Sequence, residues 1–280
     1  MQNTVTVGSE AHKELFCRSF IATHREFDPE KLPWPDLDGA ARDRLRHLPF
    51  WAEAIATEIE AGVKISAYAE QVGDPLLREA IALQGREELR HAALLSGLVA
   101  RYDISVERRP PPQLPANPEQ AFADIGYGEC IDSFFAFGLF EVTRQSGFCP
   151  KPLLDVVEPI LDEEARHIVF FVNWEAYQQC HQRRGLRLMR AARALRYYSR
   201  AVRRRLGAVR SSAGEGFTMS SSSRITVDLR PKTFLALCLR ENARRLAGFN
   251  GGLLRPRFVP ALAGLALRSL SLVPSRASAR

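Results

Sequence analysis

Apolar residues recur at alternating intervals of three and four positions along much of this chain, which is the spacing of one face of an α-helix. One such series runs Trp51, Ile55, Glu58, Gly62, Ile65, Ala69 and Val72. After the stop signal Gly73-Asp74-Pro75, a second series runs Leu77, Ile81, Gln84, Glu88, His91, Leu95 and Leu98. Because the turn between the two series is short, they predict an antiparallel helix hairpin.

A second hairpin is predicted further along the chain. Its first helix begins near Glu119 and is rich in phenylalanine, and a turn follows over residues 146–152. The returning series runs Leu153, Val157, Ile160, Glu164, His167, Phe171, Trp174 and Gln178. Between the hairpins, residues 108–118 contain five prolines, which predict a stiff, extended crossover.

Four polar members of these apolar series belong to a repeated motif. Glu87-Glu88-Leu89-Arg90-His91 recurs 76 residues later as Glu163-Glu164-Ala165-Arg166-His167. Glu and His at positions i and i+3 share one helix face. Two such faces opposed in a bundle would supply four inward ligands to a pair of metal ions.

Each hairpin is expected to donate one further carboxylate. Glu58 lies roughly 22 Å before the first turn and Glu88 roughly 20 Å after it, so the two residues meet at one level. Glu58 is therefore the candidate of the first hairpin.

The second hairpin offers three candidates. Glu164 lies about 20 Å beyond the turn, whereas Glu141, Asp132 and Glu129 lie about 8, 21 and 26 Å before it. Glu141 is too near the turn. Asp132 matches the length best, but Glu129 has the longer side chain that bridging geometry favours, and the two residues share a face. We choose Glu129, with Asp132 second.

These residues resemble the ferritin-like di-iron carboxylate superfamily, over about residues 50–180. Its pattern is one Glu, then Glu-x-x-His, then a second Glu, then a second Glu-x-x-His. The corresponding positions here are Glu58, Glu88, His91, Glu129, Glu164 and His167. The resemblance implies an all-α fold with a ferritin-like four-helix bundle, and the helical patterns outside it predict additional N- and C-terminal helices. The resemblance also implies that these six residues bind two iron ions, or one iron and one manganese, with Glu88 and Glu164 as the candidate bridging carboxylates.

The residue types support this chemistry independently of the family. Carboxylate oxygens and imidazoles suit iron or manganese, and four carboxylates offset most of the charge of two divalent cations. Such a set leaves coordination positions free, whereas a structural zinc site is closed and four-coordinate.

We expect an oxidoreductase that activates dioxygen to oxidise an organic substrate. The sequence does not identify this substrate, and an apolar compound is one option. Electrons would come from an external reductase or ferredoxin-type donor, because no Gly-x-Gly-x-x-Gly or P-loop motif is found in the chain. The alternatives are a ferroxidase or other iron-handling protein and, third, a tRNA-modifying hydroxylase.

Several other polar and aromatic residues have simpler interpretations. The motif neighbours are expected to form structural pairs behind or beside the ligands: Glu87, Arg90, Glu163 and Arg166. The histidines outside the motif are expected at the surface or in packing: His12, His24, His47 and His181. The phenylalanines could line a substrate pocket, but we favour core packing. Tyr127 could be a radical or hydrogen-bonding residue, and here too we favour packing.

Charge divides the chain into two unlike parts. Residues 1–182 hold 29 acidic and 17 basic residues, net −12, whereas residues 183–280 hold 3 acidic and 22 basic residues, net +19. Residues 183–210 contain eleven arginines at spacings that predict a basic amphipathic helix. We expect it to dock on the acidic bundle of its own chain, or else on an anionic membrane surface, or thirdly on nucleic acid.

Five segments follow from these patterns. Residues 1–49 are predicted as an N-terminal helical extension and 50–182 as the di-metal bundle. Residues 183–210 form the basic helix, 211–223 a serine- and glycine-rich flexible linker, and 224–280 a C-terminal helical appendage.

The compartment is predicted from cysteines and targeting signals. The five cysteines are scattered and include no Cys-x-x-Cys pair, which argues against a disulfide framework. No signal peptide and no run of ~20 apolar residues is found. We therefore expect a cytoplasmic protein, with peripheral membrane contact and a homodimer left open.

Overall fold

The computed structural model describes residues 5–181, 187–211 and 230–272. Within these ranges it contains nine α-helices, one short 3-10 helix and no strand. The expected all-α class is thus confirmed for the part of the chain that the structure describes.

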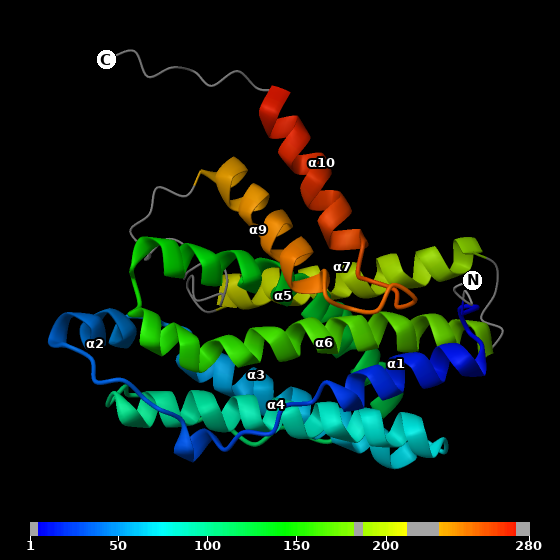
Figure 1. Cartoon of the computed structure of the whole chain (residues 1–280), viewed down its shortest axis with the longest axis horizontal. Helices are drawn as coiled ribbons and strands as arrows, with labels where there is room; N and C mark the ends of the chain where they lie inside the picture. Colours follow the sequence, from blue (N-terminus) through cyan, green and yellow to red (C-terminus); the bar gives the residue numbers. More distant parts are fainter. Residues whose placement is uncertain (1–4, 182–186, 212–229, 273–280) are drawn as a thin grey trace.

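Four long helices form the body of the molecule (Figure 1). They are α3 (Trp51–Gln71), α4 (Pro75–Arg101), α5 (Pro118–Ser146) and α6 (Lys151–His181). α3 packs along α4 and α5 along α6, while α3 also contacts α5 and α4 contacts α6. Short turns join the helices within each pair, and residues 102–117 connect the pairs.

Local sequence sets where these helices begin and end. The side chain of Asp74 accepts hydrogen bonds from the backbone N–H groups of Leu76 and Leu77, just where Pro75 starts α4. Asn117 caps α5 in the same way ahead of Pro118. Gly147, with φ of 65°, ends α5 in the left-handed region that favours glycine.

The N-terminal segment lies against the long helices. α1 (Glu10–Ala22) packs on α4 and α6. A 3-10 helix (η1, Pro29–Lys31) and the short α2 (Gly39–Arg46) follow. The indole Nε1 of Trp51 donates to the backbone oxygen of Leu45 at 2.8 Å, which fixes α2 at the start of α3.

The C-terminal helices cover α5. α7 (Arg187–Ser211) and α9 (Pro231–Leu246) both pack on α5, and α10 (Phe258–Leu272) packs on α9 and α5. Of the predicted basic helix, residues 183–186 lie outside the described residues, as do residues 212–223 of the predicted linker.

Arginines of α7 pair with acidic residues of the body. Arg200 Nη1 lies 2.9 Å from Asp124 Oδ2 on α5, and Arg205 forms an ion pair with Asp132. Arg193 Nε lies 3.3 Å from Glu175 Oε1 on α6. α7 therefore docks on its own acidic bundle, the first of the three positions expected for it.

The phenylalanines of α5 belong to the core. Phe122, Phe134 and Phe137 are at most 1% exposed, and Phe122 packs edge-on against Trp174 at a centroid distance of 4.7 Å. α5 and α6 approach closely here, because a Cβ added at Gly126 would lie 2.1 Å from the ring of Phe171. These side chains pack the interior, as we favoured.

Among the described residues, no helix has the length and apolar character needed to cross a membrane.

Candidate metal centre

The four long helices bring the six predicted residues together in two groups. One group consists of Glu58, Glu88, His91 and Glu164, and the other of Glu88, Glu129 and His167. Within each group, one ligand atom of every residue lies within 4.8 Å of the others. Glu88 belongs to both groups, so it occupies the position expected of a shared carboxylate.

Burial differs across the site. His91 and His167 are fully buried and Glu88 is 2% exposed. The side chains of Glu58 and Glu164 are 20% and 15% exposed. Glu58 and Glu164 thus form a more open edge than the histidines and Glu88, and Glu129 is also partly exposed.

Both histidines are held from behind by a buried glutamate. Nε2 of His91 lies 2.8 Å from Glu163 Oε2, and Nε2 of His167 lies 2.8 Å from Glu87 Oε2. A carboxylate at this distance accepts a hydrogen bond, so we assign the ring proton to Nε2. In a neutral ring, Nδ1 then carries no proton and presents its lone pair. In both rings Nδ1 faces the other candidate ligands.

The two motifs support each other reciprocally. Glu87, the first residue of the first motif, holds the histidine of the second motif. Glu163, the first residue of the second motif, holds the histidine of the first. We predicted that these glutamates form structural pairs behind or beside the ligands, and the structure identifies the partner of each.

Cations offset the charge of these outer glutamates. Arg166 Nη1 donates to Glu87 Oε1 at 2.8 Å, and Arg90 Nη2 donates to Glu163 Oε1 at 2.5 Å. His24 Nδ1 lies 2.5 Å from Glu87 Oε1. His24, Glu87 and Glu163 also lie within 4.8 Å of one another, but the two arginines already balance the two carboxylates. These three residues therefore lie behind the candidate ligands and help to hold them in place. His24 was predicted as a surface or packing residue, but its ring contacts the buried Glu87.

The inward Nδ1 atoms face carboxylate oxygens. Nδ1 of His91 lies 3.5 Å from Glu58 Oε2 and 3.4 Å from Glu164 Oε1. Nδ1 of His167 lies 2.9 Å from Glu88 Oε1. Within the described ranges, neither Nδ1 atom has a hydrogen-bond partner of suitable geometry, and the same holds for Oε1 of Glu88 and of Glu129. Four of the atoms that could ligate a metal are thus unsatisfied.

The pKa values indicate a site that attracts positive charge. Burial raises the pKa of Glu58 to about 8. Burial, reinforced by the charges of Glu88 and Glu164, raises the pKa of Glu129 well above its ordinary value. Burial alone would lower the pKa of His91, but the carboxylates around its ring raise that pKa well above the usual range.

The outer glutamates and Glu88 behave in the opposite way. Burial would raise the pKa of Glu87, yet His167 and Arg166 hold it at about 2. The pKa of Glu163 is lowered for the same reason, by His91 and Arg90 against burial. Glu88 is likewise held well below its ordinary pKa by His167 and His91, despite its burial.

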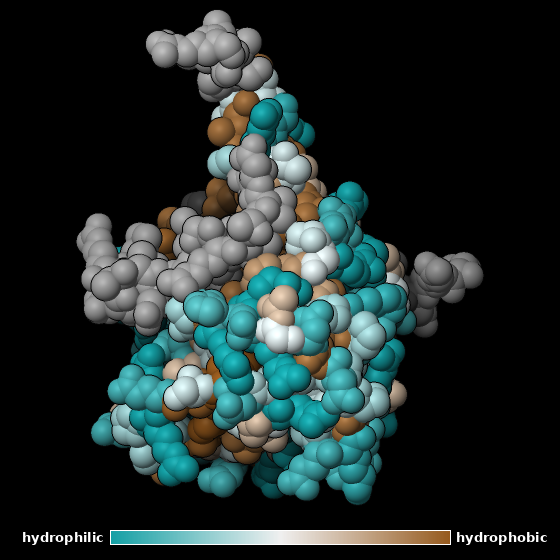
Figure 2. Space-filling model, turned by 90° about the vertical axis from the view of Figure 1, so that its left-hand side faces the viewer, coloured by the Kyte–Doolittle hydropathy of each residue, from teal (hydrophilic) through white to brown (hydrophobic). Residues whose placement is uncertain are grey.

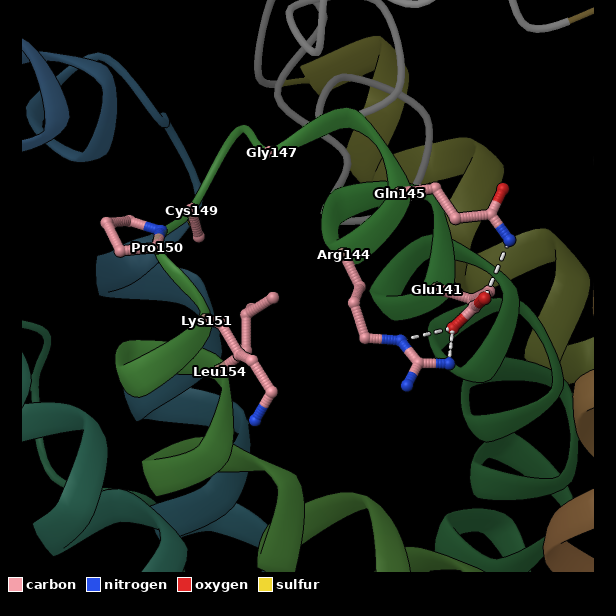
Figure 3. A pocket seen from close by; sticks show the side chains of 8 residues that line it. All are labelled: Glu141, Arg144, Gln145, Gly147, Cys149, Pro150, Lys151 and Leu154. Carbon is pink, nitrogen blue, oxygen red and sulfur yellow. Dashed lines mark hydrogen bonds and ion pairs between the residues drawn. The ribbon is translucent and has the colours of Figure 1, made fainter.

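The structure separates the three carboxylates considered on α5. Glu129 lies in the second group of candidate ligands, whereas Asp132 forms an ion pair with Arg205 of α7. Glu141 pairs with Arg144 and also accepts from Gln145 at 2.6 Å. Figure 3 shows this pair beside a cavity of about 500 Å³ at the turn between α5 and α6. None of the six predicted residues lines that cavity.

Two further polar side chains touch the site and were not singled out from sequence. Gln84 Nε2 donates to Glu129 Oε2 at 3.4 Å, and Ser133 Oγ donates to Glu164 Oε2 at 3.2 Å. Gln84 lies one helical turn before Glu88, and Ser133 lies one turn after Glu129. That spacing was the available signal for both.

Tyr127 lies in an aromatic cluster beside the site. Its hydroxyl donates to Glu175 Oε1 at 3.2 Å, and its ring stacks on Tyr197 of α7 at a centroid distance of 5.0 Å. The residue therefore packs α7 against α5, in agreement with the interpretation we favoured.

The chain matches no protein-family model, no curated protein and no solved structure. The chemistry of the site therefore has to support the functional argument by itself.

Proposed function

We propose that the protein is a di-iron carboxylate oxidoreductase, with iron–manganese as the other metal pair, built on a ferritin-like four-helix bundle of α3 to α6. The observation that supports this best is the orientation of His91 and His167. Each ring is held at Nε2 by a buried glutamate and directs Nδ1 at carboxylates. A lone pair that faces carboxylate oxygens is repulsive unless a proton or a cation lies between them.

The donor set fits two divalent cations. Four carboxylates carry charge −4, which two divalent ions would balance, and burial together with the neighbouring carboxylates raises the pKa values of Glu58 and Glu129. Oxygen and imidazole donors without thiolates favour iron or manganese. The residues present therefore fit the group that the motif implies.

Each part of the site has a distinct role under this proposal. Glu58 and Glu129 would each hold one ion, and Glu88 would be shared between them. Glu87 and Glu163 would fix the histidine rings and make Nδ1 a better donor. The buried surroundings limit access of water, while the partly exposed edge at Glu58 and Glu164 offers the approach for small reactants.

Two iron ions at this site would supply electrons for the reduction of dioxygen, because each could give up one electron in passing from the ferrous to the ferric state. An external donor would return those electrons, since the sequence shows no nucleotide-binding motif. An apolar organic molecule is the substrate class we propose, because the helices around the site are lined by aromatic and aliphatic side chains.

Iron handling is the second candidate, favoured by one observation. The 500 Å³ cavity at the turn between α5 and α6 is remote from the site, and the smaller cavity beside Phe16 and Arg166 is likewise not lined by the six residues. Ferrous iron as substrate would need no larger pocket. In that case the protein would oxidise iron supplied in excess over many turnovers.

The decisive experiment is metal analysis of the full chain purified from cells supplied with iron and manganese. We expect two metal ions per chain, and an oxygen-dependent optical change after anaerobic reduction. Excess ferrous iron then separates the two candidates. A ferroxidase accumulates ferric iron beyond the two bound ions, whereas the proposed oxidoreductase stops after its bound pair is oxidised.

Two neighbouring variants of α5 provide the matched control. Glu129→Gln removes a candidate ligand, whereas Asp132→Asn removes a carboxylate one turn away that pairs with Arg205. We expect metal content to fall in the first variant and to stay unchanged in the second. A wild-type protein that binds no metal after anaerobic reconstitution would refute both candidate functions.

A further inference from the structure

We infer that the outer part of α10 is a docking surface for an anionic lipid membrane. We define the outer part of α10 as residues 264–272. α10 leaves the body beside α9, and its C-terminal end lies farthest from the long helices (Figure 1). The two buried residues of α10, Val259 and Ala263, precede this segment. The outer part therefore packs little against the described residues of its own chain.

Large apolar side chains are exposed along this segment. Leu265, Leu270 and Leu272 are 58%, 40% and 84% exposed, and Leu262 just before them is 51% exposed. Figure 2 shows hydrophobic residues at the surface of the projecting region. Exposed leucines concentrated on one projecting helix mark an interaction site, because scattered single leucines are the normal case for a protein surface.

The polar residues of this segment are compatible with an apolar environment. The hydroxyl of Ser269 donates to the backbone oxygen of Leu265 at 3.1 Å, and that of Ser271 donates to Leu267 at 2.8 Å. Each serine is thus satisfied within the helix. Arg268 is the one charge, and its long side chain can place its guanidinium at the level of the lipid headgroups.

The charge around the segment identifies the partner as anionic. From residue 242 to residue 280 the sequence contains seven arginines and no acidic residue, and two of these arginines, Arg244 and Arg245, pair with acidic residues elsewhere in the chain. Arg257, Arg268 and Lys232 are exposed, and none forms an ion pair with a described residue. Apolar side chains flanked by unpaired cations match a bilayer surface that contains anionic lipids.

Other partners fit this surface less well. A second copy of the chain would bring a second set of the same unpaired cations to the contact, and like charges would oppose it. Nucleic acid would satisfy the arginines and leave the leucines in water. At ~1.5 Å per residue, the fifteen residues of α10 reach about 22 Å, less than the ~30 Å of a bilayer core, so α10 would insert at the interface without crossing it.

The test is co-sedimentation of the full chain with phosphatidylcholine vesicles, with and without phosphatidylglycerol. We expect binding to the vesicles that contain phosphatidylglycerol, and weaker binding to pure phosphatidylcholine or at high salt. The double variant Leu265→Ser/Leu272→Ser should lower the vesicle partition coefficient at least ~10-fold. Arg268→Gln should lower it about fivefold.

Matched controls come from the connection between α4 and α5. Leu114 is 74% exposed there, and Arg108 is exposed nearby. Leu114→Ser and Arg108→Gln should leave vesicle binding unchanged. Metal content should be unaffected in all variants, so the outcome is independent of the proposed function.

Two results would overturn the inference. One is the absence of vesicle binding by the wild-type chain, or binding that the α10 variants leave unchanged. The other is a chain that elutes as a dimer and becomes a monomer in the leucine variant, with vesicle binding unaltered, which would assign the surface to a second copy.

Discussion

Glu87 and Glu163 have the same role in the two halves of the site, but their surroundings differ. Glu87 receives three donors, from His167, Arg166 and His24. Two of these contacts depend on the segment at the end of α1, because Arg166 also donates to Thr23 Oγ1 at 3.0 Å. The half of the site on α6 is thus anchored by a helix outside the four long ones.

The half on α4 has less support. Glu163 receives donors from His91 and Arg90, while Arg166 stays 4.0 Å away. The side chain of Arg90 is 14% exposed and its guanidinium stacks on the ring of Phe27 at 4.1 Å. Two motifs of matching sequence therefore need not have matching rigidity, because the contacts that orient a ligand come from elsewhere in the chain.

The largest expected effect removes the residue that both halves share. Glu88→Gln should abolish binding of both metal ions, because Glu88 belongs to both ligand groups. Metal analysis after reconstitution measures the effect, and we expect affinity to fall more than ~100-fold. Retention of one ion at wild-type affinity would show that Glu88 is not shared.

The next largest effect is expected from variants of the two glutamates that hold the histidines. Glu87→Gln and Glu163→Gln should each weaken metal binding about 10- to 100-fold, because each removes the charge that orients a histidine. We expect the larger loss for Glu87→Gln, since Glu87 holds more donors. Competitive metal titration measures both variants.

Glu175→Gln is the control for these two variants and should leave metal binding unchanged. Glu175 is also a buried carboxylate, on α6, but it contacts Tyr127 and Gln179 and none of the candidate ligands. Equal losses in the Glu87 and Glu163 variants would contradict the expectation that the additional donors of Glu87 strengthen its half of the site.

A third comparison concerns the close approaches within each helix pair. Gly126→Ala should destabilise the protein by about 1–3 kcal/mol, because the added Cβ would meet the buried ring of Phe171 at 2.1 Å. Gly62→Ala should cost less. Its Cβ would meet the side chain of Leu89 at 2.6 Å, and Leu89 is 41% exposed and can move. Denaturant unfolding measures both, and a larger loss at Gly62 would contradict this order.

The smallest effect is a pH dependence of the metal-free protein. Folding raises the pKa of Glu58 from 4.5 to about 8, so in this range the folded state binds more protons than the unfolded state. Stability due to Glu58 is therefore present at low pH and lost as pH rises from 4.5 to about 8. Melting temperatures of the chelated protein should show this decline, and Glu58→Gln should reduce it. An unchanged slope in the variant would contradict the assignment.

Helix positions were predictable because local residues determine them. Pro75 and Pro118 begin helices and Gly147 ends one, while the three-and-four spacing of apolar residues defines the inward faces. The same spacing places Glu58, Glu88 and His91 on one side of the first hairpin, and the structure brings them together. That they bind metal stays a prediction.

Contacts between distant segments were not predictable in the same way. Length counting left Glu129 and Asp132 open, since they lie one turn apart on one face. In the structure the two residues have different partners, because Arg205 of α7, 73 positions further along the chain, pairs with Asp132. His24 belongs to no apolar series, so its contact with Glu87 has no local signal.

Each histidine is oriented by a glutamate from the other motif, and this has a consequence for the order in which the site can form during synthesis. A nascent chain that has made only α3 and α4 has Glu58, Glu88 and His91, but it lacks the Glu163 that orients His91. Under the proposed function, metal capture of high affinity would then wait until α6 has been synthesised and has docked. The metal would enter the finished protein, and the isolated first hairpin would compete poorly for it.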